Sequence, residues 1–339
     1  MRAGLVAGDI GDAAALAGLA PAWWELWHRA DATPFQSPAW LIPWWRHFQP
    51  GELFVVTVRR RHRLVGLAPF YIEHGGAGRR VLPLGISLSD YHDVLLDPDD
   101  RDAAAAALVD HLADQAARWD AWELEELAPD AAALALPCPQ DCSERLIEQS
   151  ACPVLLLPPN ARTITDVIPA RKRRDTNLAR NRAERCGEVR IESADDRTAD
   201  AFLNVLIKLH TARWHSRGET GVLADSLVQQ FHRAALPGLV ANGLLRLYLV
   251  QIGGRPASIY YGFMHCGRAY TYLTGFDPAF AFESPGVIVL AHAIAQALAE
   301  GAHEIHFLRG RETYKYEWGG IDRWNRKRSF RRTGAMARA

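Results

Sequence analysis

The chain lacks an excess of either charge, because 39 lysine and arginine residues balance 39 aspartate and glutamate residues among its 339 residues. This balance does not indicate a nucleic acid or a strongly acidic partner. The chain also lacks an apolar run of the ~18 residues that a membrane-spanning helix needs. Its apolar N-terminal segment carries Asp9 and Asp12, which makes it a poor signal peptide. We therefore expect a cytoplasmic protein that does not insert into a membrane.

Cysteine is scarce and odd in number, with five residues, so the sequence predicts no disulfide framework. A zinc site built from Cys138, Cys142 and Cys152 would need a fourth ligand and usually a tighter spacing, so no metal is expected. A Gly-x-Ser-x-Gly motif and a Ser-His-Asp order are both missing from the sequence. This argues against a covalent hydrolase.

Hydrophobic residues make up 49% of the chain, which supports a substantial core, and the length suits two domains. Most of the eleven tryptophans lie in the N-terminal segment and at residues 119–122, where they are expected to pack in the core. The proline-rich segment Pro153–Asn160 is the predicted boundary between the two halves. In the first half the sequence predicts helices at 13–30, Pro38–His47 and Asp102–Ala117, and strands at Leu53–Arg59, Leu64–Ile72, Val81–Leu84, Val94–Leu96 and Ala121–Leu127.

The most informative stretch runs from Tyr270 to Gly320. Residues 270–274 and 303–308 alternate as strands do, and an apolar, helix-like run lies between them. Ser284-Pro285-Gly286 opens this run with a favoured N-cap residue and a favoured first-turn proline, and Gly301 marks its end. A strand–helix–strand unit of this kind implies a right-handed parallel crossover.

Two features of the second half are candidate anion sites. The first is the start of the predicted helix, where free N–H groups attract a phosphate and Gly286 leaves the backbone accessible. The alternative is that Ser-Pro-Gly only starts a helix. The second is Ala170–Arg185, which holds seven basic residues against two acidic ones. It is either a solvated helix or a face for a phosphate-bearing ligand, RNA included.

The second half resembles a known family in the order of its elements and in several segments. A strand, two helices, a three-stranded meander and the strand–helix–strand unit follow one another, as in GNAT acyltransferases. Residues from about Arg171 to Gly310 resemble the CelD-like, or BioF-type, acetyltransferase domain of that superfamily. The segments that carry the resemblance are RKRRDTNLARNRAE, LHTARWHSRGETG, LRLYLVQIGGRPASIYYGF, YLTGFDPAFAFESPGVIVLAHAI and GAHEIHFLRGRETYKYEW, with FQSPAWLIPWW and LSDYHDVLL in the first half.

The same family is similar to the FemABX peptidyltransferases, which carry two GNAT-like domains in tandem. The resemblance implies an α/β (α+β) fold of two tandem GNAT-like domains, with mixed sheets flanked by helices. The expected domains are residues 1–155 and 156–325, with residues 326–339 as a strand or tail that returns to the first domain. The resemblance also implies acetyl-CoA or another acyl-CoA as co-substrate. The chain departs from the family's Arg/Gln-x-x-Gly-x-Gly/Ala loop, since Phe280–Gly286 holds a single glycine.

The candidate site residues surround the predicted helix start and the neighbouring strand ends. Acyl transfer needs a held donor, a base for the acceptor and a stabilised oxyanion. The donor-binding candidates are Ser284, Gly286 and Arg309, the catalytic candidates are Asp90, Glu312 and Lys315, and the acceptor-binding candidates are His210, Arg213, Trp214 and Asp277.

Several of these residues have a structural alternative. Asp277 precedes a proline and is typical of a turn, and His210 is equally suited to a helix face. Arg309, Glu312 and Lys315 are alternatively surface ion pairs. If Lys315 is catalytic, its loss is expected to lower turnover and leave the melting temperature nearly unchanged.

Three hypotheses of function remain open on the sequence. The first is an acyl-CoA-dependent acyltransferase that acts on an amine or hydroxyl of a small molecule or glycan precursor, in polysaccharide or envelope metabolism. The second is a FemABX-like aminoacyl transferase that uses charged tRNA, which the sequence favours less. The third is a non-catalytic binding protein of a polysaccharide-synthesis assembly.

Overall fold

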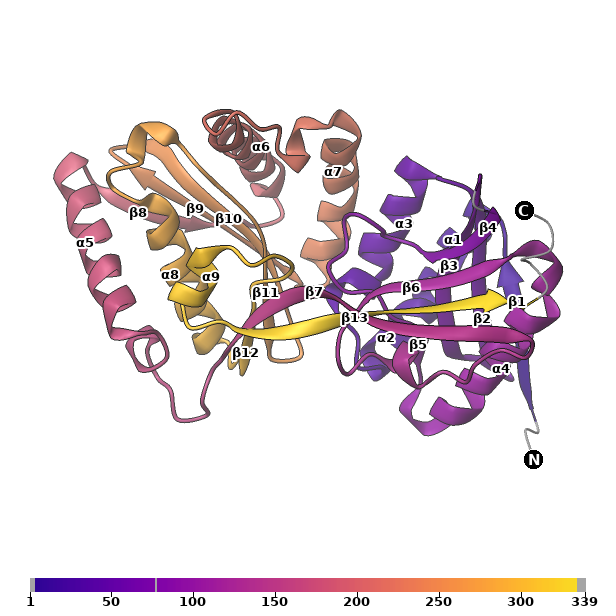
Figure 1. Ribbon diagram of the computed structural model, residues 1–339. Coiled ribbons are helices and arrows are strands. Elements are labelled where there is room, and N and C mark those ends of the chain that lie inside the picture. The colour runs from indigo at the N-terminus through magenta and orange to yellow at the C-terminus, as the bar shows by residue number, and fades with distance from the viewer. Residues whose placement is uncertain (1–3, 77, 334–339) are drawn as a thin grey trace. The chain divides into compact units, whose positions relative to one another are not determined.

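The computed structural model describes residues 4–76 and 78–333. The chain divides into two compact units (Figure 1). Unit 1 comprises Met1–Ser150 and Trp324–Ala339, and unit 2 comprises Ala151–Arg323. The strands β7, Cys142–Leu156, and β13, Ile321–Arg332, each run from one unit into the other.

Unit 1 is built on a mixed sheet. The strands β1 to β4 pair antiparallel in chain order, β4 pairs parallel with β6, and β6 pairs antiparallel with the end of β13. Helix α4 forms the crossover between β4 and β6. The described elements are β1 Leu5–Ile10, α1 Ala13–Gly18, α2 Ala20–Arg29, η1 Pro34–Gln36, α3 Pro38–Phe48, β2 Glu52–Arg60, β3 Arg63–Gly75, β4 Gly78–Pro83, β5 Leu95–Leu96, η2 Pro98–Asp100, α4 Arg101–Asp114, η3 Ala116–Arg118, β6 Ala121–Leu127 and η4 Ala132–Ala135.

Unit 2 repeats this order of elements. Its strands β8 to β11 pair antiparallel in chain order, β11 pairs parallel with β12 through the crossover helix α8, and β12 pairs antiparallel with the end of β7. The remaining elements are η5 Ile164–Asp166, α5 Ala170–Cys186, β8 Val189–Ser193, α6 Ala199–His215, η6 Val222–Ala224, α7 Ser226–Ala241, β9 Leu245–Ile252, β10 Arg255–His265, β11 Arg268–Phe276, η7 Pro278–Phe280, α8 Pro285–Ala299, β12 Glu304–His306 and α9 Thr313–Glu317.

The two units are therefore two copies of one topology in tandem, which confirms the predicted fold class. Each copy runs strand, helices, three-stranded meander, crossover helix and parallel strand. In each unit one more strand pairs antiparallel with the last strand of this order. The end of β13 pairs with β6 in unit 1, and the end of β7 pairs with β12 in unit 2.

Apolar periodicity explains which faces of the unit 2 sheet are covered. Tyr248, Val250 and Tyr260 face α5 and α8 within one core cluster. Tyr261 faces the other side, where its ring meets His232 of α7 at a centroid distance of 5.5 Å. Figure 1 shows α6 and α7 close together at one side of this sheet.

The tryptophans pack as the sequence predicts. Trp23, Trp27, Trp40, Trp119 and Trp122 are fully buried. Four of them also satisfy their indole N–H groups: Trp23 donates to the Gln36 carbonyl, Trp27 to the Thr33 carbonyl, Trp40 to the Ser89 hydroxyl and Trp119 to the Leu112 carbonyl. Aromatic burial without a lost hydrogen bond is a large stabilising contribution.

Three details differ from the sequence-based expectations. The predicted helix at 13–30 is two helices, because the chain breaks at Leu19 and restarts with Pro21 in the first turn of α2. The strand β7 was not predicted, and it contains Pro153, whose carbonyl accepts from the Phe307 N–H. The predicted strand 303–308 is only β12, because the chain turns after His306 and Leu308 adopts a left-handed backbone with φ 61°.

The predicted serine caps are also wrong in their chemistry. Ser37 and Ser284 stand at the N-cap positions of α3 and α8, but neither side chain bonds to the first turn. The Ser37 hydroxyl donates backward to the Pro34 carbonyl, 2.7 Å away. The prolines that follow them fix both helix starts instead.

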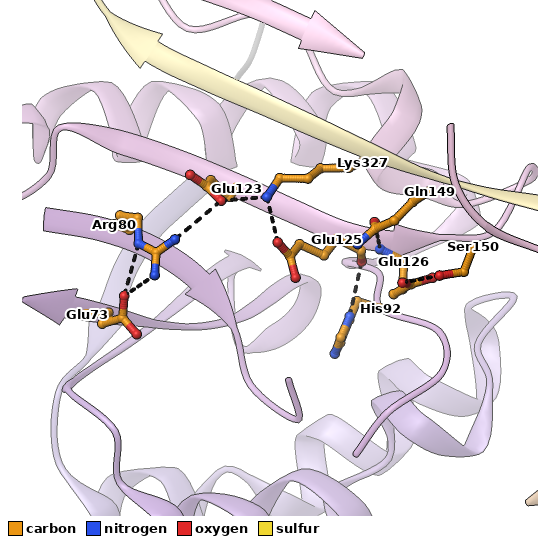
Figure 2. Close-up of polar contacts among 9 residues, drawn as sticks. All are labelled: Glu73, Arg80, His92, Glu123, Glu125, Glu126, Gln149, Ser150 and Lys327. Atoms are coloured by element: carbon orange, nitrogen blue, oxygen red, sulfur yellow. Dashed lines mark hydrogen bonds and ion pairs between the residues drawn. The ribbon is translucent and has the colours of Figure 1, made fainter. Parts of the chain in front are cut away.

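Charged pairs fasten β13 to unit 1 (Figure 2). Lys327 Nζ lies 2.7 Å from a carboxylate oxygen of Glu123 and 2.6 Å from one of Glu125, both on β6. Arg80 on β4 pairs with Glu73 on β3 and approaches Glu123 at 3.7 Å. This chain of alternating charges links three neighbouring strands and the returning one.

Candidate functional site

The candidate site is a cavity of about 320 Å³ in unit 2, at the point where β11 and β12 diverge. The two strands pair only at Arg268, Ala269 and Tyr270, after which β11 continues to Phe276 beside β10 alone. The gap opens under the start of α8. The cavity is lined by Lys172, Arg213, Arg217, Thr274, Gly275, Phe276, Ala281, Ser284, Pro285, Gly286, Val287, Leu290, Tyr314, Glu317 and Trp318.

The start of α8 presents its backbone to this cavity. Ser284 adopts a left-handed conformation, with φ 53° and ψ 52°, and its side chain does not cap the helix. A Cβ added at Gly286 would meet no atom within 4 Å. The first turn thus offers N–H groups and a positive dipole end to whatever enters, with no side chain in the way at Gly286.

A buried hydrogen bond fixes the position of this helix start. The hydroxyl of Ser258, on β10, is fully buried and donates to the Pro285 carbonyl at 2.7 Å. The anchor ties the first helical residue to the sheet. Ser284, with its strained left-handed backbone, directly precedes this anchored residue. Such strain persists where the surrounding structure holds the backbone, and it is typical of functional sites.

Arg213 supplies positive charge from α6. Its Nη1 donates to the Thr274 hydroxyl at 3.0 Å, and its guanidinium lies 5.3 Å from the centre of the Phe276 ring. Its Nε is buried and makes no hydrogen bond within the described part of the chain. Burial, with Arg217 nearby, lowers the pKa of Arg213. A partly desolvated cation with a spare donor favours an anionic ligand.

Lys172 supplies positive charge from α5, at 5% exposure. Its ammonium lies 2.7 Å from Glu317 and 5.3 Å from the centre of the Trp318 ring. The lysine is therefore held by a carboxylate and an aromatic face. Tyr314 completes this side of the cavity, and burial raises the pKa of its hydroxyl to about 12, so that the phenol keeps its proton at neutral pH.

Lys315 lies behind the cavity wall at 2% exposure. Its ammonium donates to the carbonyls of Leu308, Arg309 and Gly310 at 3.0, 2.6 and 3.2 Å. It also pairs with the exposed Glu312 at 2.9 Å. The structure thus places Lys315 and Glu312 together, with the lysine holding the turn that follows β12.

His210 and Trp214 also form a pair behind the wall. The Trp214 indole donates to His210 Nε2 at 2.9 Å, which places the ring proton on Nδ1. Burial, with Arg213 nearby, lowers the pKa of His210 to about 4, so the ring is neutral at pH 7. A Cβ at Gly221 would lie within 2.4 Å of both rings, so the loop after α6 covers them tightly.

The other predicted site residues lie elsewhere. Asp277 caps the short helix η7, accepting from the Ala279 N–H at 3.0 Å, which is the turn role that its sequence context favoured. Arg309 follows β12, and its carbonyl binds Lys315. Asp90 belongs to unit 1, where its carbonyl accepts from Asn325 at 3.1 Å. Ser284, Gly286 and Arg213 are the predicted residues that line the cavity.

The equivalent place in unit 1 is filled by the chain itself. After the short β4–β6 pairing, His92 lies beside β6, where it bridges Leu127 and its N–H donates to the Glu126 carbonyl at 3.1 Å. The contact from His92 Nδ1 to the Glu125 carbonyl is visible in Figure 2.

The short helix η2, which precedes α4, is capped by a buried carboxylate. Asp97, at 1% exposure, accepts from Arg29, Arg63 and the Asp99 N–H. A carboxylate of the protein thus takes up the hydrogen bonds of both arginines. The cavity at the start of the crossover helix is described in unit 2.

Several residues of the cavity wall were not predicted from the sequence, among them Lys172, Thr274, Phe276, Tyr314, Glu317 and Trp318. Lys172 belongs to a helix with seven basic residues, and no local pattern marks the one that turns inward. Tyr314 and Trp318 lie in a cluster of aromatic and charged residues that follows β12. That cluster is the sequence pattern from which they could have been predicted.

Residues 4–76 and 78–333 contain no group of three His, Cys, Asp or Glu side chains placed to hold a metal ion. In the same ranges, the helices are too short or too polar to cross a bilayer.

Comparison with protein families gives one match. Residues 170–316 match the family described as an acetyltransferase (GNAT) domain. This range contains α5 through most of α9, and so nearly all of the cavity wall. Among proteins of curated function, no sequence matches this chain.

Comparison with solved structures shows the fold. The chain is similar to FemX, with TM-score 0.65 and 12% identity over 95% of this chain and 96% of that one. It is similar to a conserved protein of Bacteroides thetaiotaomicron, with TM-score 0.58 and 12% identity over 96% and 99%. It is also similar to L-PGS of Bacillus licheniformis, with TM-score 0.57 and 12% identity over 94% and 92%.

Proposed function

We propose that the protein is a GNAT-type acyltransferase whose unit 2 cavity binds an acyl-CoA and transfers the acyl group to an amine or hydroxyl. The observation that carries this proposal is the open, uncapped start of α8, set between diverging strands and flanked by Lys172, Arg213 and Arg217. The match of residues 170–316 to an acetyltransferase domain supports the same assignment.

In this proposal the donor's pyrophosphate lies at the first turn of α8, where Ser284 and Gly286 leave the N–H groups accessible. The pantetheine arm then follows the unpaired edge of β11 past Thr274. Arg213 binds a phosphate or a carboxylate of the substrates through its spare Nε–H. Arg309 follows β12, and we propose it as a further cation for the donor.

Transfer requires the acceptor nitrogen or oxygen to attack the thioester carbon, the C–S bond to break and the leaving thiolate to gain a proton. Tyr314 lines the cavity with its proton retained, so we propose it as the donor to the thiolate. Glu312, which pairs with Lys315, is proposed as the base. Lys315 acts by holding the turn at residues 308–310 and thus positions Tyr314.

For the acceptor we propose a small molecule or glycan precursor of polysaccharide or envelope metabolism. The basis is the resemblance to CelD-like, BioF-type domains in the sequence segments given above. His210 and Trp214 are proposed to shape the acceptor side through Arg213, and Asp277 through the turn that precedes α8. A cytoplasmic location stays a prediction from the sequence.

A second candidate is aminoacyl transfer from charged tRNA. The fold similarity to FemX supports it, and so does the exposed basic surface of α5. A tRNA donor would bind with an affinity that falls steeply with salt, because phosphate contacts release counterions. A non-catalytic binding role is the third candidate, and turnover of any acyl donor would eliminate it.

Thermal shift tests the proposal. Acetyl-CoA and longer acyl-CoAs are each titrated at low and high salt, beside a transfer RNA. We expect a rise in melting temperature with at least one acyl-CoA. No shift with any acyl-CoA, together with a salt-sensitive shift by the RNA, would favour aminoacyl transfer.

A further inference from the structure

An exposed aromatic side chain lies next in sequence to residues that line the cavity. Phe282 is 69% exposed, the largest exposed fraction among the exposed phenylalanine and tryptophan side chains of the described residues. It stands between Ala281 and Ser284, both of which line the cavity. Exposure of a phenylalanine to this extent forgoes much of the free energy that its burial would supply, so this position calls for an explanation.

A cation holds the phenylalanine in place. The Arg182 guanidinium, from α5, lies 4.3 Å from the centre of the Phe282 ring. Arg182 Nη1 also donates to the Phe282 carbonyl at 3.2 Å. The arginine covers one face of the ring and fixes the backbone, and the exposed fraction shows that the rest of the ring faces solvent.

The surroundings are basic. Arg185 and Leu178 lie one turn on either side of Arg182 on the same face of α5, by helical geometry, and both are exposed. A flat apolar ring backed by a guanidinium, next to a phosphate-binding cavity, is the arrangement that proteins use to stack a nucleobase.

We propose that Phe282, backed by Arg182, is the stacking platform for the adenine base of the donor. This inference rests on the proposed function and extends it to the nucleotide end of the donor. The adenine is chosen because both candidate donors carry it: coenzyme A ends in a 3′-phosphorylated adenosine, and transfer RNA ends in adenosine. The platform lies outside the cavity, where the nucleotide end would emerge once the pyrophosphate is held at α8.

The experiment compares coenzyme A with 4′-phosphopantetheine, which lacks the adenosine, by calorimetric titration of the full chain. Phe282→Ala is expected to weaken coenzyme A binding about tenfold and to leave phosphopantetheine binding unchanged. Phe282→Trp keeps an aromatic face and is expected to restore the affinity, whereas Phe282→Leu is not. Leu178→Ala, another exposed apolar change on α5, is the matched control and is expected to have no effect.

The outcomes separate this inference from the proposed function. If coenzyme A binds and Phe282→Ala weakens neither ligand, or both equally, the platform is wrong and the cavity assignment stands. If the wild type binds no coenzyme A but binds an RNA minihelix that ends in CCA, and Phe282→Ala weakens that binding, the platform stands and the donor is tRNA. If neither ligand binds, both proposals fail.

Discussion

At the scale of single residues, the role of Lys315 differs most between the sequence-based prediction and the structure. The sequence alone left it between a surface ion pair and a catalytic cation, with an unchanged melting temperature on its loss. The structure forms the ion pair with Glu312, but it also buries the ammonium among three carbonyls, so the lysine is not exposed as that alternative assumed. A buried hydrogen-bonded charge of this kind stabilises the turn it holds.

We predict that Lys315→Met lowers the free energy of unfolding by about 2–4 kcal/mol, because three carbonyls, one buried and two partly buried, lose their donor. Arg180→Ala is the control, since Arg180 and Glu184 form an exposed pair on α5 at 2.9 Å. Such a pair contributes about 0–1 kcal/mol. Equal stability of Lys315→Met and the wild type in urea unfolding would remove Lys315 as a structural residue.

Individual residues also show which parts of the site could be predicted from the sequence. Ser284 and Gly286 were found because the chemistry of a helix start is local. Lys172 and Trp318 were missed because their contact joins residues far apart in the chain. Asp277 was assigned to substrate although its proline neighbour favoured the cap that it forms.

At the scale of elements, local patterns predicted strands and helices well. The bounds of β6 agree with the prediction, and α8 follows from its proline start and Gly301, which has φ 81°. The strand β7 was missed because its first part carries exposed polar residues and its second part holds Pro153. Its pairing with β12 depends on residues more than a hundred positions away, which no local pattern contains.

The start of β12 carries a pH-dependent contribution to stability. Hydrogen bonds from His306 and Arg323 hold the pKa of Glu304 at about 2, below its usual value. His306 stays neutral, because burial lowers its own pKa. A carboxylate with a depressed pKa stabilises the fold above the unfolded pKa, and the contribution is lost as pH falls toward the folded pKa.

We predict that Glu304→Gln destabilises unit 2 at pH 7, by no more than about 3 kcal/mol. The difference from the wild type should shrink as pH falls from about 4.5 toward 2. Urea unfolding at several pH values measures it. A difference that stays constant over this range would show that the carboxylate has no depressed pKa.

At the scale of the whole molecule, the tandem repeat is completed by β13, whose C-terminal part belongs to unit 1. The family resemblance implied that residues 326–339 return to the first domain, but it did not show which contacts would hold them there. Lys327 provides that attachment, because it neutralises Glu123 and Glu125 on β6 at once. These carboxylates also raise the pKa of Lys327 against the effect of its burial.

We predict that Lys327→Met lowers the stability of unit 1 by about 1–3 kcal/mol, since two neighbouring carboxylates would lose their shared cation. Lys327→Arg keeps the charge and should retain most of the stability. Hydrogen exchange of the β6 and β13 amides reports the change at its site. Unaltered protection in Lys327→Met would mean that strand pairing alone holds β13.

The central claim is that the start of α8 binds the donor, and Gly286 tests it most directly. Because a Cβ at Gly286 meets no atom within 4 Å, Gly286→Leu fills the cavity without disturbing the fold. Calorimetric titration with acetyl-CoA should show binding to the wild type, and at least a tenfold loss in Gly286→Leu at an unchanged or higher melting temperature. Equal affinity of the two proteins for acetyl-CoA would contradict the account.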